Sequence, residues 1–347
     1  MSAVKQTADA LYTICPVFVA SNVAAEKGWL QEEFEKSGVS LRYLRSLPDN
    51  QGWLPHYQHS LPNLFRDGGA IPALTSRSQG RETLLVGLTA PQRAGRIVVR
   101  ADSGIYTVND LRGKRIGLFK SANAAKVDFA RATQEQGIDS VLRLYGMDRS
   151  EIEFVDLVDE DRPRWEPAEK PSELWAQTRQ AGWFQDHSEV RALLDGHVDA
   201  LYEPQGRLVK LEEEGLITTI LDLSAIPDWR VQVSNSPYTI TVSRELAEKR
   251  PEAVVAFLRA SLRAAAWIRD NREEAAEIFV KVTYAPNAQW ARIYLEGLEL
   301  EPGFAPRSIA ALEIQKRFLL DYGYIEKDFD LKEWAAPQFL AEAAEGL

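Results

Sequence analysis

The chain contains little sulfur and little histidine. Its 347 residues include one cysteine, Cys15, two methionines and four histidines. A single cysteine cannot form an internal disulfide bond, which fits a reducing compartment. The sequence also lacks the CxxC, HExxH, P-loop and GxGxxG spacings that signal metal or nucleotide sites. We therefore expect neither a metal nor a cofactor.

Two further absences bear on partners and location. No apolar run reaches the ~18 to 20 residues that a membrane span needs, and the first residues lack the basic and apolar regions of a secretory signal. The formal net charge of −10 argues against general nucleic-acid binding. We expect a cytoplasmic, monomeric protein with no membrane or nucleic-acid partner.

Length and patterning predict an α/β protein with two lobes. A chain of 347 residues is long for one core, and alternating strand and helix patterns are typical of parallel sheets flanked by helices. We expect residues 1–100 and 233–347 to form lobe one and residues 101–232 to form lobe two. The chain would cross between the lobes near Arg100 and near Gln232.

Cys15 lies near the end of the first predicted strand, Leu11–Pro16. The carboxyl ends of strands are where open α/β sheets bind their ligands. Other patterns predict a helix over Phe18–Ser37, a strand over Val39–Leu47 and a helix around Pro62–Asp67. The Pro-bearing segments 51–61 and 159–172 are candidate lids over a cleft.

The stretch from Gln51 to Leu74 contains a group of residues suited to binding an anion. Arg66 offers a planar fork for an oxyanion, and the amides around Gly68 and Gly69 are not shielded by a β-carbon. His56 or His59 could transfer a proton near neutral pH. The stretch lacks a nucleophile or strong proton donor, which Cys15 could supply. Each feature also has a common explanation: a lone cysteine is usually a small core residue, and an Arg-Asp-Gly-Gly run is an ordinary turn.

Three segments of the sequence resemble segments of proteins whose fold is known. VNDLRGKRIGL, VDALYEP and SRELAEKRPEAVVAFLRA are similar to segments of the sulfonate-, taurine- and thiamine-precursor-binding proteins. This resemblance implies a two-lobed, type II periplasmic-binding-protein-like fold. Each lobe would be a mixed sheet flanked by helices, and the lobes would close on a ligand by hinge motion.

A narrower resemblance concerns function. The segments YTICPV, HYQHSLPNLFRDGGAIPAL, DGHVDALY and FLLDYGYIEKDFDLKEWAAPQFL resemble the 2′-hydroxybiphenyl-2-sulfinate desulfinase family of dibenzothiophene desulfurisation. His59 stands where that family has a tyrosine. The resemblance implies two catalytic residues, Cys15 and His56, and a substrate-binding set that we expect to comprise Arg66, Gly68, Gly69, Thr13 and His59.

The resemblance implies hydrolysis of the carbon–sulfur bond of an aryl sulfinate to an arene and sulfite, a redox-neutral reaction that needs no cofactor. Cys15 could protonate the ipso carbon as a thiol or attack sulfur as a thiolate. The alternative is a non-catalytic sulfonate or aromatic solute-binding protein with the same fold, for which Cys15 would not matter. A relative of the pyrimidine synthases would be expected to have more cysteine and histidine.

Overall fold

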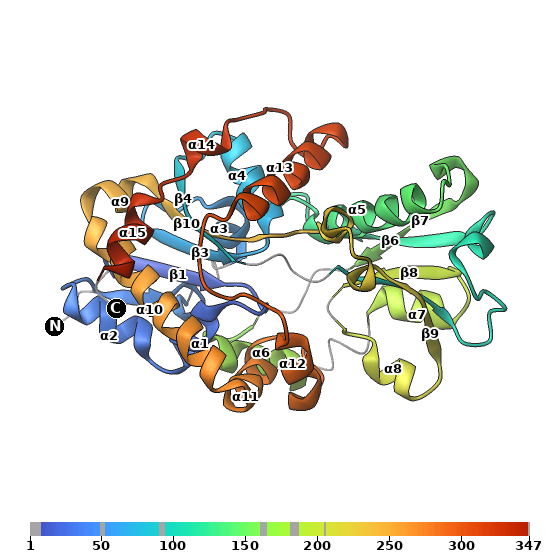
Figure 1. Cartoon of the computed structure of the whole chain (residues 1–347), viewed down its shortest axis with the longest axis horizontal. Helices are drawn as coiled ribbons and strands as arrows, with labels where there is room; N and C mark the ends of the chain where they lie inside the picture. The colour runs from blue at the N-terminus through green and yellow to red at the C-terminus, as the bar shows by residue number, and fades with distance from the viewer. Residues whose placement is uncertain are drawn as a thin grey trace.

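Two five-stranded mixed β-sheets lie side by side and organise the chain (Figure 1). The structure is a computed structural model, and it describes residues 8–48, 53–89, 94–159, 165–180, 187–204 and 206–345. Helices cover both sheets. This architecture confirms the predicted fold class of two mixed sheets flanked by helices.

The first sheet has the strand order β2–β1–β3–β10–β4. The first three of these strands are parallel, and β10 runs antiparallel to both of its neighbours. All residues of β1, β3, β4 and β10 are buried, as is typical of strands that helices cover on both faces. The bounds are Ala10–Ile14 (β1), Leu41–Tyr43 (β2), Leu64–Gly68 (β3), Thr83–Thr89 (β4) and Tyr238–Ser243 (β10).

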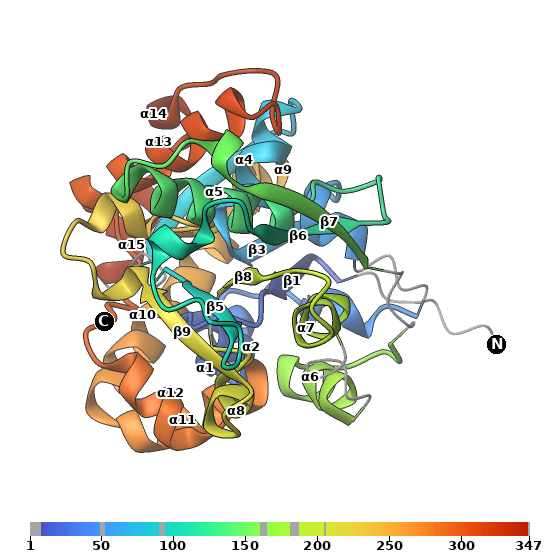
Figure 2. The same ribbon diagram turned by 90° about the vertical axis from the view of Figure 1, so that its right-hand side faces the viewer.

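The second sheet has the order β7–β6–β8–β5–β9. β6 runs parallel to β7 and β8, and β5 runs antiparallel to β8 and β9. Figure 2 turns this sheet toward the viewer. The bounds are Arg96–Arg100 (β5), Arg115–Ser121 (β6), Glu153–Asp159 (β7), Ala200–Glu203 (β8) and Ile217–Asp222 (β9).

Helices from both ends of the chain cover the first sheet. The long helix α10 begins with a proline, which suits the first helical position, and it packs on α1, α2 and α15. On the opposite face, α4 contacts α3 and α13. These helices are α1 (Ala20–Glu26), α2 (Trp29–Lys36), α3 (Trp53–Gln58), α4 (Ala70–Ser78), α9 (Arg244–Lys249), α10 (Pro251–Asp270), α11 (Arg272–Val282), α12 (Ala288–Leu295), α13 (Pro306–Asp321), α14 (Leu331–Trp334) and α15 (Gln338–Ala344).

The helices beside the second sheet are fewer. In Figure 1, α5 lies above this sheet and α7 and α8 lie below it. Short 3-10 turns connect the strands. The bounds are α5 (Phe129–Leu144), α7 (Ser188–Leu194), α8 (Val209–Glu213), η2 (Val108–Leu111), η3 (Arg149–Glu151), η4 (Leu223–Ala225) and η5 (Trp229–Gln232). A further 3-10 turn, η1 (Leu44–Ser46), follows β2 of the first sheet.

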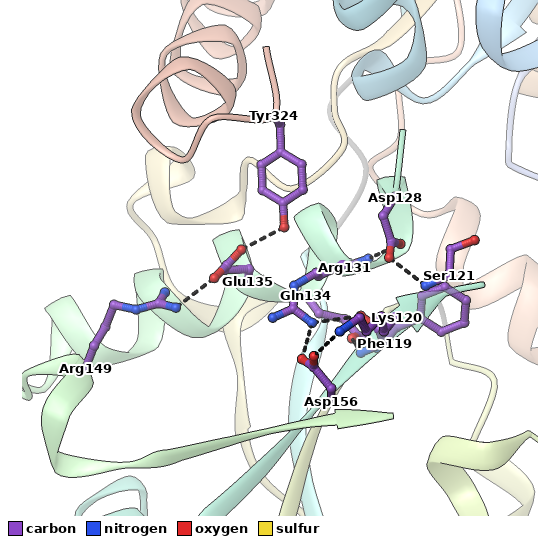
Figure 3. A network of polar contacts seen from close by, with 10 residues as sticks. All are labelled: Phe119, Lys120, Ser121, Asp128, Arg131, Gln134, Glu135, Arg149, Asp156 and Tyr324. Carbon is purple, nitrogen blue, oxygen red and sulfur yellow. Dashed lines mark hydrogen bonds and ion pairs between the residues drawn. The ribbon is translucent and has the colours of Figure 1, made fainter. Parts of the chain in front are cut away.

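A polar network ties α5 to the C-terminal part of the chain (Figure 3). The hydroxyl of Tyr324 donates to Glu135 Oε2 at 2.7 Å, and Arg149 Nη2 donates to Glu135 Oε1 at the same distance. One turn earlier on α5, Arg131 Nη1 donates to Asp156 Oδ1 of β7 at 2.6 Å. The segment after α13 therefore braces the helix that lies over the second sheet.

Among the described strands, the sequence passes from the first sheet to the second after β4 and returns after β9. Residues 96–100, which the predicted domain boundary placed in lobe one, form β5 of the second sheet. The helix α6 (Pro171–Gln180), expected in lobe two, packs on α1 and α11 beside the first sheet. Its apolar residues Leu174 and Trp175 join that core. Strand and helix patterns do not specify which sheet a segment joins.

Two predicted elements are wrong. The helix expected over Phe18–Ser37 is two helices, because Gly28 adopts the left-handed conformation (φ 76°) between them. The helix expected around Pro62–Asp67 is the strand β3, and the helix α3 falls in the preceding segment, which was expected to be a loop. Residues 51–52 and 160–164 of the two candidate lids lie outside the described residues.

Candidate active site

A cavity of about 90 Å³ opens at the carboxyl ends of β1 and β3. Cys15 directly follows β1, as predicted, and faces the cavity together with His56 of α3 and Arg66 of β3. This edge of a sheet is where parallel strands place ligand-binding groups. The lining residues are Ile14, Cys15, Pro16, Val17, Tyr43, Arg45, His56, Tyr57, Arg66, Gly69, Pro72, Phe129, Leu174, Trp175, Asn235 and Tyr284.

Two polar contacts link three residues from the sheet to the thiol. Cys15 Sγ lies 3.2 Å from Nε2 of His56, and Nδ1 of His56 lies 2.9 Å from Oγ1 of Thr13. His56 and Thr13 are both buried, so few other groups compete for the ring nitrogens. The threonine hydroxyl fixes the imidazole plane, and the imidazole points its second nitrogen at the sulfur.

Arg66 joins the same group of residues from the neighbouring strand. Its Nε donates to the backbone oxygen of His56 at 2.9 Å, and its Nη2 lies 3.8 Å from Cys15 Sγ. The side chain is fully buried, and Nη1 has no hydrogen-bond partner among the described residues. A buried donor without a partner is costly, so this nitrogen is suited to an anionic acceptor in the cavity.

The Gly-Gly pair allows close approach on two sides. A β-carbon on Gly68 would overlap with the side chain of Cys15, and the residue has φ 152°, which L side chains rarely adopt. A β-carbon on Gly69 would overlap with the side chain of Asn235. Asn235 Oδ1 in turn accepts from the N–H of Ile71 in the first turn of α4 at 3.0 Å. Both glycines are therefore required by packing at the site.

The thiol and the imidazole are both held in their neutral forms. Burial raises the pKa of the Cys15 thiol, and the charge of Arg66 and the N–H of Gly69 only partly oppose this effect. Burial, followed by the charges of Arg66 and Arg45, lowers the pKa of His56 well below its usual value. Desolvation disfavours the charged form of each group. At neutral pH the pair is therefore a thiol beside an uncharged imidazole.

Three residues of the predicted substrate-binding set do not line the cavity, and the first, Gly68, lies directly behind Cys15. His59 lies under β3 and β10, where its Nε2 is 3.1 Å from the oxygen of Leu64 and its Nδ1 is 3.4 Å from Oγ1 of Thr241. Burial lowers the pKa of His59 to about 3. Thr13 contacts His56 and is absent from the cavity wall. The ring of His59 therefore contacts two strands of the first sheet, and Thr13 contacts the imidazole of His56.

The sequence interpretation missed most of the wall. The aromatic lining comes from Tyr43, Tyr57, Phe129, Trp175 and Tyr284, and the Tyr57 and Phe129 rings stack at 5.5 Å. Arg45 also lines the cavity and lies in the turn η1 that follows β2. The sequence did not point to Arg45, because the predicted strand Val39–Leu47 placed this residue inside the strand and not at its carboxyl end.

The described residues contain no group of three or more His, Cys, Asp or Glu side chains arranged to hold a metal ion. Within the same residues, no helix has the length and apolarity to span a bilayer. The polar side chains that line the cavity are a thiol, an imidazole, two guanidinium groups, the Asn235 amide, the Trp175 indole and three tyrosine hydroxyls.

Comparison with solved structures places the fold in a class. The aliphatic sulphonate binding protein SsuA from Escherichia coli superposes with a TM-score of 0.64 over 94% of this chain and 91% of its own, at 17% identity. The fold is thus that of the periplasmic binding proteins. A family model described as NMT1/THI5 like matches residues 16–163 and 184–275, which is more than half of the chain, and the protein belongs to this family.

Other relatives agree with the resemblance predicted from the motifs. The 2′-hydroxybiphenyl-2-sulfinate desulfinase of Rhodococcus erythropolis is 28% identical, with 98% of this chain and 94% of the relative covered. The crystal structure of a cysteine-to-serine mutant of the enzyme DSZB in complex with biphenyl-2-sulfinic acid has a TM-score of 0.72, at 26% identity over 97% and 99% of the two chains. A putative aliphatic sulfonates-binding protein of Bacillus subtilis (strain 168) is 21% identical. The predicted resemblance to the desulfinase family is confirmed.

Proposed function

We propose that the protein is an aryl sulfinate desulfinase, which hydrolyses 2′-hydroxybiphenyl-2-sulfinate or a close analogue to 2-hydroxybiphenyl and sulfite. The observation that carries the proposal is the position of Cys15 Sγ, 3.2 Å from Nε2 of His56 and 3.8 Å from Nη2 of Arg66. An acid, a base and an anion-binding group thus meet at one point. Two relatives that are 28% identical over 98% of this chain are named 2′-hydroxybiphenyl-2-sulfinate desulfinase.

The sulfinate group would bind beside the thiol. Arg66 offers the Nη1 donor that lacks a partner in the described residues, and Gly69, whose N–H lowers the pKa of the Cys15 thiol, lines the same cavity. A guanidinium and a backbone amide that converge on one oxyanion form charge-assisted hydrogen bonds. The aryl group would then lie against the aromatic wall of Tyr57, Phe129 and Trp175.

The raised pKa of the Cys15 thiol favours the proton-donor role. The thiol protonates the ipso carbon while the carbon–sulfur bond breaks, which releases the arene, SO₂ and a thiolate. Water adds to SO₂ to give bisulfite and a proton, and this proton returns to the thiolate. His56 Nε2 lies where it can hold the thiol proton and guide its return. The sum is sulfinate plus water giving arene plus bisulfite.

A solute-binding protein with the same fold is the competing function, since sulfonate-binding proteins are also relatives. Binding an anion requires only the donors of Arg66 and Gly69. It does not require a thiol aligned with an imidazole that a buried threonine orients. This alignment favours the enzyme.

Sulfite release from 2′-hydroxybiphenyl-2-sulfinate tests the proposal. We expect Cys15→Ser to lose at least about 100-fold in kcat, because a hydroxyl is a much weaker acid than a thiol. Calorimetry should find the substrate still bound to this variant with a similar Kd. Substrate binding without sulfite release by the wild type would instead establish a solute-binding protein.

A cytoplasmic location and a monomeric state belong to the same proposal. The support for the location is chemical, since the single thiol must stay reduced to act as an acid. Cell fractionation and size-exclusion chromatography test these two points.

A further inference from the structure

Asn235 lies in the segment that leads from the second sheet back to the first. After β9 the chain passes through η4 and η5, and residues 233–237 then connect η5 to β10. Of these five residues, Asn235 alone lines the cavity beside Cys15. The connection between the two sheets therefore contributes one polar side chain to the candidate active site.

All but one of the hydrogen-bonding groups of Asn235 have a partner. Its backbone N–H donates to Oε1 of Gln315 on α13 at 2.6 Å, and its backbone oxygen accepts from the N–H of Ala70 at 3.4 Å. Its side-chain Oδ1 accepts from the N–H of Ile71 at 3.0 Å. Because only the oxygen of the amide can accept from an N–H, the contact with Ile71 fixes the orientation of the amide. Nδ2 is then left without a hydrogen-bond partner among the described residues.

Contacts to both sheets fix the position of this amide. Asn235 has φ 56°, a left-handed conformation that asparagine adopts more readily than most residues. The preceding Ser234 donates from Oγ to the backbone oxygen of Thr133 on α5 at 3.1 Å, and the same Oγ accepts from the hydroxyl of Tyr202 on β8 at 3.3 Å. Asn235 is therefore anchored to the second sheet through Ser234 and to the first through the amides at the start of α4.

The Nδ2 group of Asn235 lies beside the anion-binding groups already described. A β-carbon on Gly69 would lie 2.5 Å from Nδ2, so Gly69 and the amide are in close contact. Arg66 Nη1 also lacks a partner among the described residues, and the described lining of the cavity contains no carboxylate. Donors without an acceptor are costly in a buried site unless a ligand supplies the acceptor. The oxygens of a sulfinate have enough lone pairs for both side-chain donors and for the N–H of Gly69.

We propose that Asn235 is a further substrate-binding residue, whose Nδ2 donates a hydrogen bond to the sulfinate group. This inference rests on the proposed desulfinase function and adds to the anion site a donor that belongs to the connection between the two sheets. An amide binds an anion without adding a charge that would shift the pKa of Cys15 or His56. The competing role is structural: Asn235 would only accept from Ile71 and so cap α4.

Calorimetry with a Cys15→Ser protein tests the proposal, because it measures binding without turnover. The ligands are 2′-hydroxybiphenyl-2-sulfinate and the uncharged 2-hydroxybiphenyl. In this protein, Asn235→Asp keeps the acceptor for Ile71 and loses the donor, whereas Asn235→Gly loses both, adds no charge and suits the positive φ. We expect each substitution to weaken binding of the sulfinate at least about 10-fold, because each removes a hydrogen bond to a charged group. The Kd of 2-hydroxybiphenyl should stay nearly unchanged.

The two substitutions share only the loss of Nδ2. Weaker sulfinate binding in Asn235→Asp alone would be due to repulsion by the new carboxylate, and in Asn235→Gly alone it would be due to the lost cap of α4. Either result overturns the inference, as does equal weakening for both ligands. Asn287→Gly is the matched control: Asn287 caps α12 by accepting from the N–H of Trp290 at 2.8 Å and does not line the cavity. Both Kd values should stay unchanged in this control.

A second neutral variant covers a folding failure. If Asn235→Gly does not fold, Asn235→Ser takes its place with the same expected loss, because a serine hydroxyl can accept from Ile71 but the shorter side chain lacks the amide donor. Sulfite release by the wild type is measured separately. A protein that binds the sulfinate without releasing sulfite refutes the proposed function, while the Kd comparison still decides the role of Asn235. A Cys15→Ser protein that does not bind the sulfinate overturns the inference.

Discussion

Gly68 lies directly against Cys15, and no β-carbon fits between the backbone of Gly68 and the sulfur. The same residue pairs with Thr239 of β10, so the sheet holds its backbone in place. The position of the thiol is therefore set by the absence of a side chain on the next strand, and this relationship leads to the first prediction.

Gly68→Ala should displace the Cys15 sulfur from its contact with His56. We expect kcat for sulfite release to fall at least about 10-fold, while the free energy of unfolding falls by about 1–3 kcal/mol, as for other overpacked sites. Gly303→Ala is the control, because a β-carbon there meets no atom within 4 Å. Equal activity in the two variants would show that the close approach at position 68 is unimportant.

The sequence predicted the position of Cys15 and the spacing of His56, Arg66 and the glycines, but it did not predict β3. Arg66 and Asp67 are adjacent in this strand and both are about 1% exposed. A central strand buried on both faces shows no alternation of polar and apolar residues, and two charged residues followed by glycine resemble a turn. Arg66 faces α3, whereas Asp67 contacts Ser21 of α1. Residues 64–68 therefore form a strand because the helices on both faces of the sheet bury them, although their local sequence is typical of a turn.

The residues of the cavity wall could not be predicted from the sequence for a different reason. Phe129, Trp175 and Tyr284 come from segments separated by tens of residues, and only the folded arrangement brings them together. His59 illustrates the opposite error, since its proximity in sequence to His56 suggested a shared role. His59 instead has φ 47° directly after α3, and its ring contacts β3 and β10.

Thr13 is predicted to act through the imidazole. Thr13→Val removes the hydroxyl 2.9 Å from His56 Nδ1 and preserves the shape of the side chain. We expect kcat to fall by about 10-fold with little change in KM, because the loss concerns the orientation of His56 in the chemical step. Thr13→Ser restores the hydroxyl and should recover most of the activity. A parallel fall in the valine and serine variants would mean that packing, and not the hydroxyl, matters.

The pKa of the Cys15 thiol can be measured directly, because the chain has no other cysteine. Only the thiolate reacts with iodoacetamide, so the rate of alkylation against pH gives this pKa. Burial raises it, and we expect a midpoint above the ordinary value of about 8.5. Arg66 lowers the pKa, so Arg66→Gln should move the midpoint further up. The denatured protein should show the ordinary value, and a native midpoint below that value would favour the nucleophilic role.

Because the carboxyl of Asp67 is buried, we expect the free energy of unfolding to depend on pH. Its carboxyl is buried, Oδ2 accepts from Ser21 Oγ at 2.5 Å, and Oδ1 has no partner among the described residues. Burial raises its pKa to about 7. The unfolded chain releases this proton near pH 4, so the stabilising contribution is complete below about pH 4 and is lost as the pH rises through about 7.

The substitution Asp67→Asn removes this titration, because an amide side chain does not ionise. The variant should therefore become more stable relative to the wild type between about pH 5 and about pH 8, by up to a few kcal/mol, and the gain should then level off. Urea unfolding at several pH values measures it. Asp110→Asn is the control: hydrogen bonds from the N–H groups of Tyr106 and Thr107 lower the pKa of exposed Asp110, so its effect should be constant over this range. A constant difference for Asp67→Asn as well would mean that the carboxyl of Asp67 is already ionised at about pH 5 in the folded protein.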